Sequence, residues 1–219
     1  MTTASRMAMF PLGTVLLPGA GLPLHVFEPR YRQMVKDVLA ADGPAEFGVV
    51  LIVRGTEVGG GDERADVATV ARIIDARVTG DGRYALMAGG HRRIRVIEWL
   101  ADDPYPQAMV QDWPDAAADD PSAVVAETRR LRDDVATLRA RVGLDAVTPP
   151  ALADDSIRDA GPVVGSYRLA AWTPAGPADA HRALCASGPV ERLAVLAAVV
   201  DDLTAVADFR DATGGGDPR

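Results

Sequence analysis

The chain contains one lysine, Lys36, and this limits the chemistry that the sequence can perform. A phosphate-binding P-loop needs the pattern G-x-x-x-x-G-K-[ST], whose lysine reaches the β- and γ-phosphates. A serine–lysine peptidase needs a lysine amine beside its nucleophile. Lys36 lies in the stretch YRQMVKDVL, with neither a glycine loop nor a serine next to it. We therefore predict neither activity and assign no catalytic residue.

Three histidines and one cysteine are further candidates for nucleophilic or metal chemistry. His25 lies in an apolar, strand-like run, where we expect a partly buried imidazole with a backbone partner. His181 and Cys185 are four residues apart on an expected helix, so their side chains share a face. They would form half of a metal site or a Cys-His pair, but no third ligand is near, and a packed thiol beside a surface histidine is the simpler interpretation. We predict no metal site and no cofactor.

The run HRRIR is the densest basic cluster in the sequence. On a strand, His91, Arg93 and Arg95 share one face because successive side chains alternate. Three basic groups there could contact an anion, an acidic peptide or RNA. The competing interpretation is an exposed strand face paired with nearby carboxylates such as Asp102, which an acidic protein supplies in number.

Residues 10–35, FPLGTVLLPGAGLPLHVFEPRYRQMV, carry the most distinctive pattern. Their leucines exceed what one pair of two-sided strands can bury, and glycines and prolines interrupt the strands. Such a surface can accept an extended apolar peptide by strand addition, although core packing is the expected role of most of these leucines. Glu28 precedes a helix and is expected to accept its N–H groups or pair with an arginine. The candidate binding residues are Leu12, Leu16, Leu17, Leu22, Leu24, Glu28, Arg30 and Tyr31.

Composition narrows the class of protein. The formal net charge of −8 and the pI of about 4.9 argue against wrapping a nucleic-acid backbone. The single cysteine excludes an internal disulfide and fits a reducing compartment. No apolar run reaches the roughly 18 residues of a membrane span, and the N-terminus lacks a signal-peptide apolar region. We expect a cytoplasmic protein that binds neither membrane nor nucleic acid.

The order of the expected elements predicts an α+β fold. Strands are expected near 8–16, 22–27, 46–54, 67–79, 83–89, 91–101 and 105–113, and helices near 29–41, 121–142, 162–172, 177–187 and 189–208. Residues 1–6 are expected to fray, 54–66 to form an exposed hairpin tip, and 143–162 to form a loop or hinge with at most a short helical turn. We predict a β-rich lobe over 7–115, a helical lobe over 119–208 and a disordered tail over 209–219.

Several motifs in fixed order resemble the Lon N-terminal, or LON substrate-binding, domain. FPLG, LPG and LPLHVFEPRYR stand at the spacing of that family and are followed by its helix. Residues 68–73 and the run GHRRIRV match the family's next block, with Ala68 where the family usually has glycine. The stretch SGPVERLAVLAAVVDDL resembles its helical part. The resemblance covers most of residues 8–206.

This resemblance implies a PUA-like pseudo-barrel followed by a helical lobe, and recognition of unfolded or apolar polypeptide segments. Full-length Lon proteases add an ATPase and a Ser-Lys peptidase, for which this chain has no suitable lysine. We therefore predict a stand-alone, non-catalytic binding module, with a separate protease or chaperone as a candidate partner. The alternatives are an RNA-binding PUA-like protein, or a peptidase-family protein with residual hydrolase activity.

Overall fold

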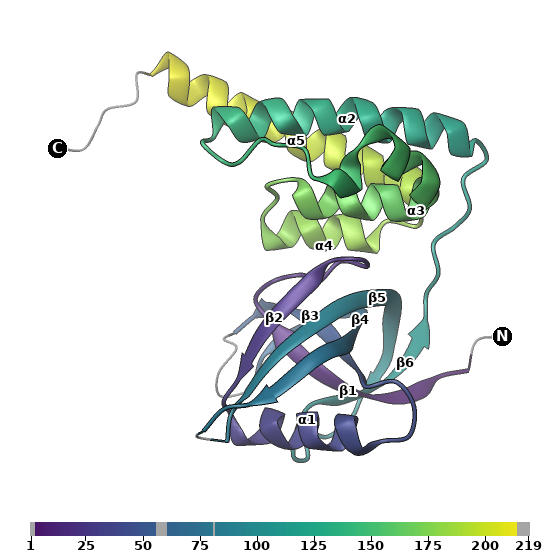
Figure 1. Cartoon of the computed structure of the whole chain (residues 1–219), viewed down its shortest axis with the longest axis vertical. Helices are drawn as coiled ribbons and strands as arrows, with labels where there is room; N and C mark the ends of the chain where they lie inside the picture. The colour runs from purple at the N-terminus through teal and green to yellow at the C-terminus, as the bar shows by residue number, and fades with distance from the viewer. Residues whose placement is uncertain (1–2, 56–60, 81, 214–219) are drawn as a thin grey trace. The chain divides into compact units, whose positions relative to one another are not determined.

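The computed structural model describes residues 3–55, 61–80 and 82–213, and the chain divides into two compact units (Figure 1). The barrel unit is Met1–Pro114 and the helical unit is Asp115–Arg219. The barrel unit contains β1 Ser5–Leu12, β2 Gly21–Val26, α1 Pro29–Ala40, β3 Glu46–Arg54, β4 Glu63–Val78, β5 Tyr84–Trp99 and β6 Gln107–Asp112. The helical unit contains α2 Pro121–Arg141, a 3-10 turn η1 Pro150–Leu152, α3 Asp154–Trp172, α4 Pro177–Cys185 and α5 Pro189–Ala212.

The described strands close into a pseudo-barrel, as the α+β prediction expected. Their order is β2-β5-β4-β3-β1-β6, and β6 also pairs with β5, which closes the ring. The pairing of β1 with β3 is parallel and the other pairings are antiparallel. β5 is one strand rather than the two predicted around Gly90, because residues 84–89 pair with β2 while residues 94–99 pair with β6.

The front of the chain differs from the prediction at both ends of β1. The strand begins at Ser5, because residues 5–8 pair with β6 instead of fraying. It ends at Leu12, directly before Gly13, so residues 13–16 belong to the connection toward β2. This connection brings its leucines back over β5, where the Gly19 N–H donates to the Gly90 carbonyl at 2.8 Å.

Alternation along β1 separates two apolar layers. Met9 points into a cluster with Val70 and Ile94, whereas Phe10 packs in a second cluster with Met34 of α1. Burying each large apolar side chain stabilises the fold by about 1.5–3 kcal/mol. The second cluster holds α1 against the sheet and so fixes the position of the segment between β2 and α1.

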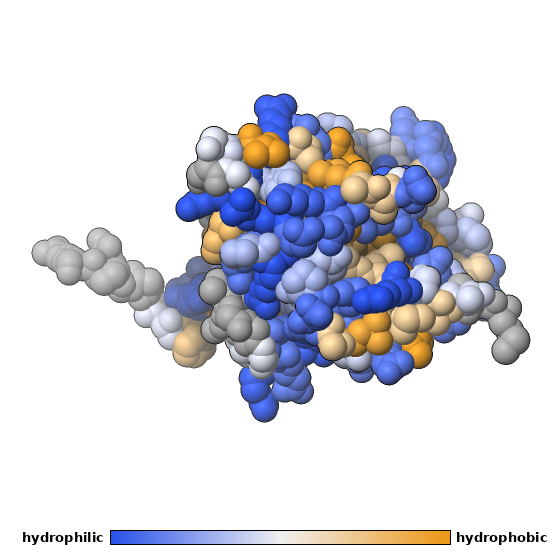
Figure 2. Space-filling view, turned by 90° about the horizontal axis from the view of Figure 1, so that it is seen from below, coloured by the Kyte–Doolittle hydropathy of each residue, from blue (hydrophilic) through white to orange (hydrophobic). Residues whose placement is uncertain are grey.

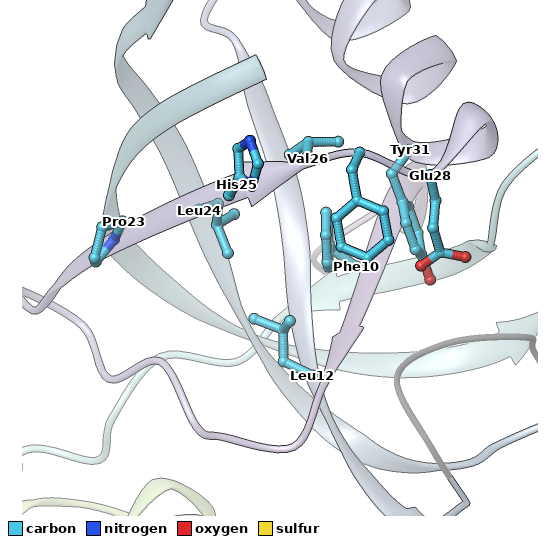
Figure 3. A pocket seen from close by; sticks show the side chains of 9 residues that line it. Phe10, Leu12, Pro23, Leu24, His25, Val26, Glu28 and Tyr31 are labelled. Atoms are coloured by element: carbon cyan, nitrogen blue, oxygen red, sulfur yellow. The ribbon is translucent and has the colours of Figure 1, made fainter. Parts of the chain in front are cut away.

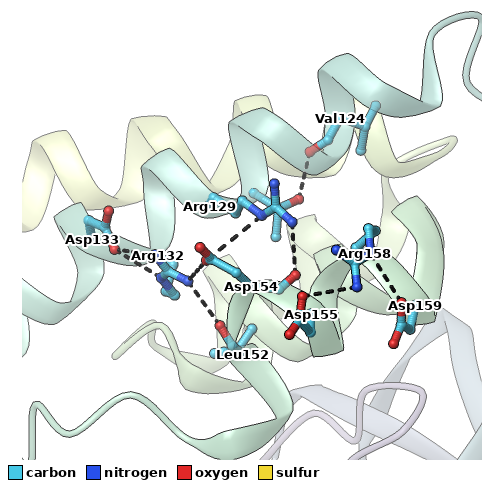
Figure 4. Close-up of polar contacts among 10 residues, drawn as sticks. Val124, Arg129, Arg132, Asp133, Leu152, Asp154, Asp155, Arg158 and Asp159 are labelled. Carbon is cyan, nitrogen blue, oxygen red and sulfur yellow. Dashed lines mark hydrogen bonds and ion pairs between the residues drawn. The ribbon is translucent and has the colours of Figure 1, made fainter.

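In the helical unit, α3 begins earlier than predicted. Residues 154–160 are helical, and Gly161 introduces a kink with φ 75°. The two carboxylates of Asp154 and Asp155 lie in the first turn, where they interact favourably with the helix dipole. Arg132 of α2 binds Asp154, so the added turns are tied to α2 (Figure 4).

One buried arginine organises the interior of the helical unit. Arg192 of α5 is completely buried. It donates to the Ala183 carbonyl (3.1 Å) and to Ser166 Oγ (2.9 Å), and it forms an ion pair with Asp115. Its guanidinium carbon lies 3.5 Å from the ring centroid of Tyr167, whose hydroxyl donates to Asp115 at 3.0 Å. This cluster therefore joins the first residue of the unit to α3, α4 and α5.

The C-terminal helix also runs beyond its predicted end. α5 extends to Ala212, so residues 209–212, which the prediction placed in the tail, are helical. Arg141 of α2 binds Asp208 (2.7 Å) and Asp211 (2.8 Å), which fastens the last turns. Residues 214–219 of the predicted tail and residues 56–60 of the predicted hairpin tip lie outside the described residues. Within the described residues, no helix is long and apolar enough to cross a membrane.

Candidate functional site

A pocket of about 200 Å³ lies in the barrel unit where β1, β2 and the first turn of α1 meet (Figure 3). We call it the front pocket. Its lining residues are Phe10, Leu12, Pro23, Leu24, His25, Val26, Phe27, Glu28 and Tyr31. Four of the eight predicted binding residues therefore line one cavity: Leu12, Leu24, Glu28 and Tyr31.

The local sequence explains this assembly. Phe10 and Leu12 are two residues apart on β1, so their side chains share a face. Pro29 occupies the first turn of α1, where its missing N–H costs little, and this sharp start brings Tyr31 beside Phe10. The two rings stack with centroids 4.2 Å apart and an interplanar angle of 17°. The pocket thus has an aromatic wall held by the core.

The polar groups at the pocket form one small cluster. Glu28 makes no side-chain cap to α1; instead Arg30 Nε donates to Glu28 Oε2 at 3.2 Å, the second of the two predicted roles. Burial raises the pKa of Tyr31 to about 12, although the nearby Arg30 cation opposes this shift. Tyr31 is therefore a neutral phenol at neutral pH. The arrangement offers an apolar cavity with one ion pair and suits binding rather than acid–base chemistry.

β2 adds an open sheet edge beside the pocket. Among the described strands, β2 pairs only with β5, so its other edge is unpaired. Pro23 lies on this strand, which is typical of an edge because proline has no N–H to donate. His25 is exposed, with its ring 6.4 Å from that of Phe27, so the predicted partial burial is wrong. The alternation of β2 turns this imidazole outward.

The remaining predicted leucines divide by burial. Leu16 and Leu17 are buried, at 3% and 4% exposure, and Leu22 is half-buried. None of the three lines the front pocket, and most of the leucines are core residues as the sequence suggested. Phe27 was missed, yet its ring is 49% exposed at the pocket. The sequence signal that could have identified Phe27 is its position between the end of β2 and the start of α1.

Apolar exposure alone does not mark the site. Large apolar side chains are exposed on several elements, among them Val53, Ile74 and Ile97. On the face drawn in Figure 2, hydrophobic side chains form separate patches among hydrophilic ones. Scattered exposed apolar residues are normal on a protein surface. What distinguishes the front pocket is the combination of a cavity, an exposed aromatic ring and an open strand edge.

The arginines of the predicted basic cluster make contacts within the barrel unit. Arg93 is 3% exposed and donates from Nε to the Trp113 carbonyl at 3.0 Å. The guanidinium carbons of Arg93 and Arg95 lie 3.9 and 4.1 Å from the Trp113 ring centroid. His91 and Arg95 are exposed. The three side chains therefore do not form a single exposed basic face, because the middle one holds the end of β6 in place.

The other candidate groups stay apart from any reactive arrangement. Cys185 Sγ lies 3.7 Å from each ring nitrogen of His181, so the two side chains that were expected to share a helix face lie beside each other on α4. No group of three or more His, Cys, Asp or Glu side chains that could hold a metal occurs in the described part of the chain. Lys36 is exposed on α1, away from the buried face of that helix.

Comparison with known proteins places these features in a wider group. The model of the ATP-dependent protease La (LON) substrate-binding domain matches residues 6–201. Lon protease 2 of Myxococcus xanthus is 32% identical over 127 residues, which are 57% of this chain and 15% of that protein. Lon protease of Anaeromyxobacter dehalogenans is 30% identical over 107 residues, which are 48% of this chain and 12% of that protein.

Two solved structures share the fold. The crystal structure of a Lon N-terminal domain protein from Xanthomonas campestris has a TM-score of 0.61 and 27% identity, covering 89% of this chain and 98% of that one. The N-terminal domain of Mycobacterium avium complex Lon protease has a TM-score of 0.65 and 17% identity, covering 90% and 99%. The similarity thus extends across both units, whereas only a small fraction of each full-length Lon protease is aligned.

Proposed function

This chain belongs to the LON substrate-binding domain family, and from that premise we propose that it binds unfolded or exposed apolar polypeptide segments without catalysing a reaction. The observation that carries the proposal is the front pocket, an apolar cavity beside the open edge of β2. The match to the substrate-binding family supports a role in binding polypeptide substrates. The finer role, recognition of unfolded segments at this pocket, rests on its geometry.

The size of the pocket favours one side chain of an extended peptide. A volume of about 200 Å³ is below the roughly 300–1,000 Å³ of typical small-molecule sites. Burying one large apolar side chain contributes about 1.5–3 kcal/mol. The peptide backbone can add hydrogen bonds along β2, except at Pro23, where the N–H is missing. Because each such contact is weak, clients with repeated apolar residues are favoured.

This mode of binding selects for loss of structure. A folded client buries its apolar side chains and pairs the backbone of its strands. It therefore offers no apolar side chain to the front pocket and no unpaired backbone to the edge of β2. We propose that the chain presents bound segments to a separate protease or chaperone. Its one cysteine, Cys185, has no second cysteine in the chain with which to form a disulfide, which fits action in a reducing compartment such as the cytoplasm.

Replacing Phe27 by aspartate should weaken binding of a chemically denatured client by about tenfold or more. The change removes an apolar contact worth about 1.5–3 kcal/mol and adds a negative charge beside Glu28. The ring is 49% exposed, so the melting temperature should hardly change. Fluorescence anisotropy with a labelled, reduced and carboxymethylated client measures the affinity.

The matched control is Ile97→Asp, which places the same charge at a side chain of similar exposure (54%) on β5, outside the pocket lining. It should bind the denatured client as the parent does. If Phe27→Asp binds as tightly as the parent, or if both variants lose binding equally, the front pocket is not the binding site.

The chain should neither hydrolyse ATP nor digest casein in the presence of ATP. Its one lysine, Lys36, is exposed on α1 without a phosphate-binding glycine loop, so Lys36→Ala should leave client binding unchanged. Phosphate release and casein fluorescence assays measure both activities. ATP turnover that disappears in Lys36→Ala would contradict the non-catalytic proposal.

A further inference from the structure

A second cavity, of about 350 Å³, lies wholly within the helical unit between the N-terminal halves of α2 and α5. We call it the acidic groove. Its lining residues are Asp119, Asp120, Ala123, Val124, Glu127, Val190, Leu193 and Ala194. Val124 and Leu193 form a buried apolar floor, whereas Val190 is 60% exposed. The groove therefore exposes an apolar surface between two helices.

Every charged side chain that lines the acidic groove is a carboxylate. Glu127 is held by Arg130 at 2.6 Å, and Asp120 Oδ1 accepts two backbone N–H groups in the first turn of α2. No ion pair in the described part of the chain involves Asp119, which is exposed. Asp119 therefore carries a charge at the groove that the helical unit does not neutralise by a direct contact.

The net charge of the whole helical unit is also negative. Residues 115–219 contain 17 aspartates and glutamates but 11 arginines, so most of the chain's negative charge belongs to this unit. A negatively charged surface with low-dielectric apolar walls raises the local concentration of cationic partners and disfavours anionic ones.

We propose that the acidic groove docks a cationic amphipathic helix. Such a helix would place an aliphatic side chain on Val124 and Leu193, and a lysine or arginine one turn away against Asp119. A helix suits this position because its apolar stripe can pack into a groove between two helices. The partner is a polypeptide of different chemistry from the extended apolar segments assigned to the barrel unit. The inference thus goes beyond the proposed function and does not depend on it.

Two synthetic helical peptides with the same leucine stripe test this inference. One carries lysine on its polar face and the other carries glutamate, and fluorescence anisotropy measures their affinity for the full chain. The lysine peptide should bind and the glutamate peptide should not. Asp119→Asn should weaken binding by about threefold, the effect of one surface charge pair, and this loss should shrink at high salt. Val190→Ser should weaken binding at all salt concentrations.

Matched controls lie elsewhere on α5. Asp201→Asn removes an exposed carboxylate and Val206→Ser removes an exposed valine (48%), both outside the groove lining. Neither should change the affinity. Equal binding of the two peptides, no binding of the lysine peptide, or an unchanged affinity in Asp119→Asn would overturn the inference. Loss of binding in Phe27→Asp would also overturn it, because the peptide would then occupy the front pocket, while the proposed function would stand.

Discussion

Replacing Arg192 by methionine should lower the free energy of unfolding of the helical unit by about 3–5 kcal/mol. The guanidinium is completely buried and binds Asp115, Ser166 Oγ and the Ala183 carbonyl. Methionine fills much of the same space but leaves these oxygens without their donor. The largest cost comes from Asp115, whose carboxylate would lose its buried cation.

Urea denaturation followed by far-UV circular dichroism measures this effect, because most of the helical signal comes from α2 to α5. Arg182→Met is the matched control: Arg182 and Asp179 form an exposed pair on α4, worth about 0–1 kcal/mol. The double variant Asp115→Asn, Arg192→Met should lose less than the sum of the two single losses, since the groups act as one network. A loss below 1 kcal/mol in Arg192→Met would show that the cluster adds little to stability.

Elements with strong local patterns were predictable from the sequence. β3, expected over 46–54, runs Glu46–Arg54, and α1, expected over 29–41, runs Pro29–Ala40. Continuous apolar residues between turn signals define the first, and a proline in the first turn with a helical apolar stripe defines the second. In both cases the information lies within the element itself.

Elements that depend on distant partners were not predictable in the same way. Two strands were expected, near 83–89 and 91–101, but pairing with β2, β4 and β6 makes β5 one continuous strand through Gly90. Asp154 and Asp155 followed a proline-rich segment that favoured a loop, yet contacts with α2 stabilise helix there. Such pairings join residues far apart in the chain, and no local pattern encodes them.

The front pocket shows the same division. Of the eight residues predicted from the surplus of leucines and the family resemblance, Leu12, Leu24, Glu28 and Tyr31 line this cavity, and they lie in or beside regular elements. Leu16 and Leu17 lie in the irregular connection before β2, where spacing does not determine which side chain faces the core. Asp119 of the acidic groove was missed because its role depends on the packing of α2 against α5. The geometry of both cavities therefore depends on tertiary contacts more than on motifs.

Gly90→Ala should destabilise the barrel unit by about 2–3 kcal/mol and weaken client binding at the front pocket. A Cβ atom at Gly90 would overlap the Leu17 carbonyl oxygen and approach Leu16 Cγ to 3.2 Å. The connection has little room to move, because the Gly90 N–H donates to the Ala20 carbonyl and the Gly90 carbonyl accepts from the Gly19 N–H, both at 2.8 Å. Displacing it shifts the start of β2 and with it the pocket wall.

The neighbouring glycine provides the control for this prediction. In Gly89→Ala the new Cβ would meet the tip of Ile74 at 3.1 Å, and Ile74 is 69% exposed and can rotate away. This variant should keep the parent's melting temperature within a few degrees, measured by thermal denaturation. It should also keep the parent's affinity for a denatured client, measured by fluorescence anisotropy. If Gly90→Ala matches Gly89→Ala in both measurements, the connection is not held rigidly on β5. The shape of the front pocket would then not depend on this connection.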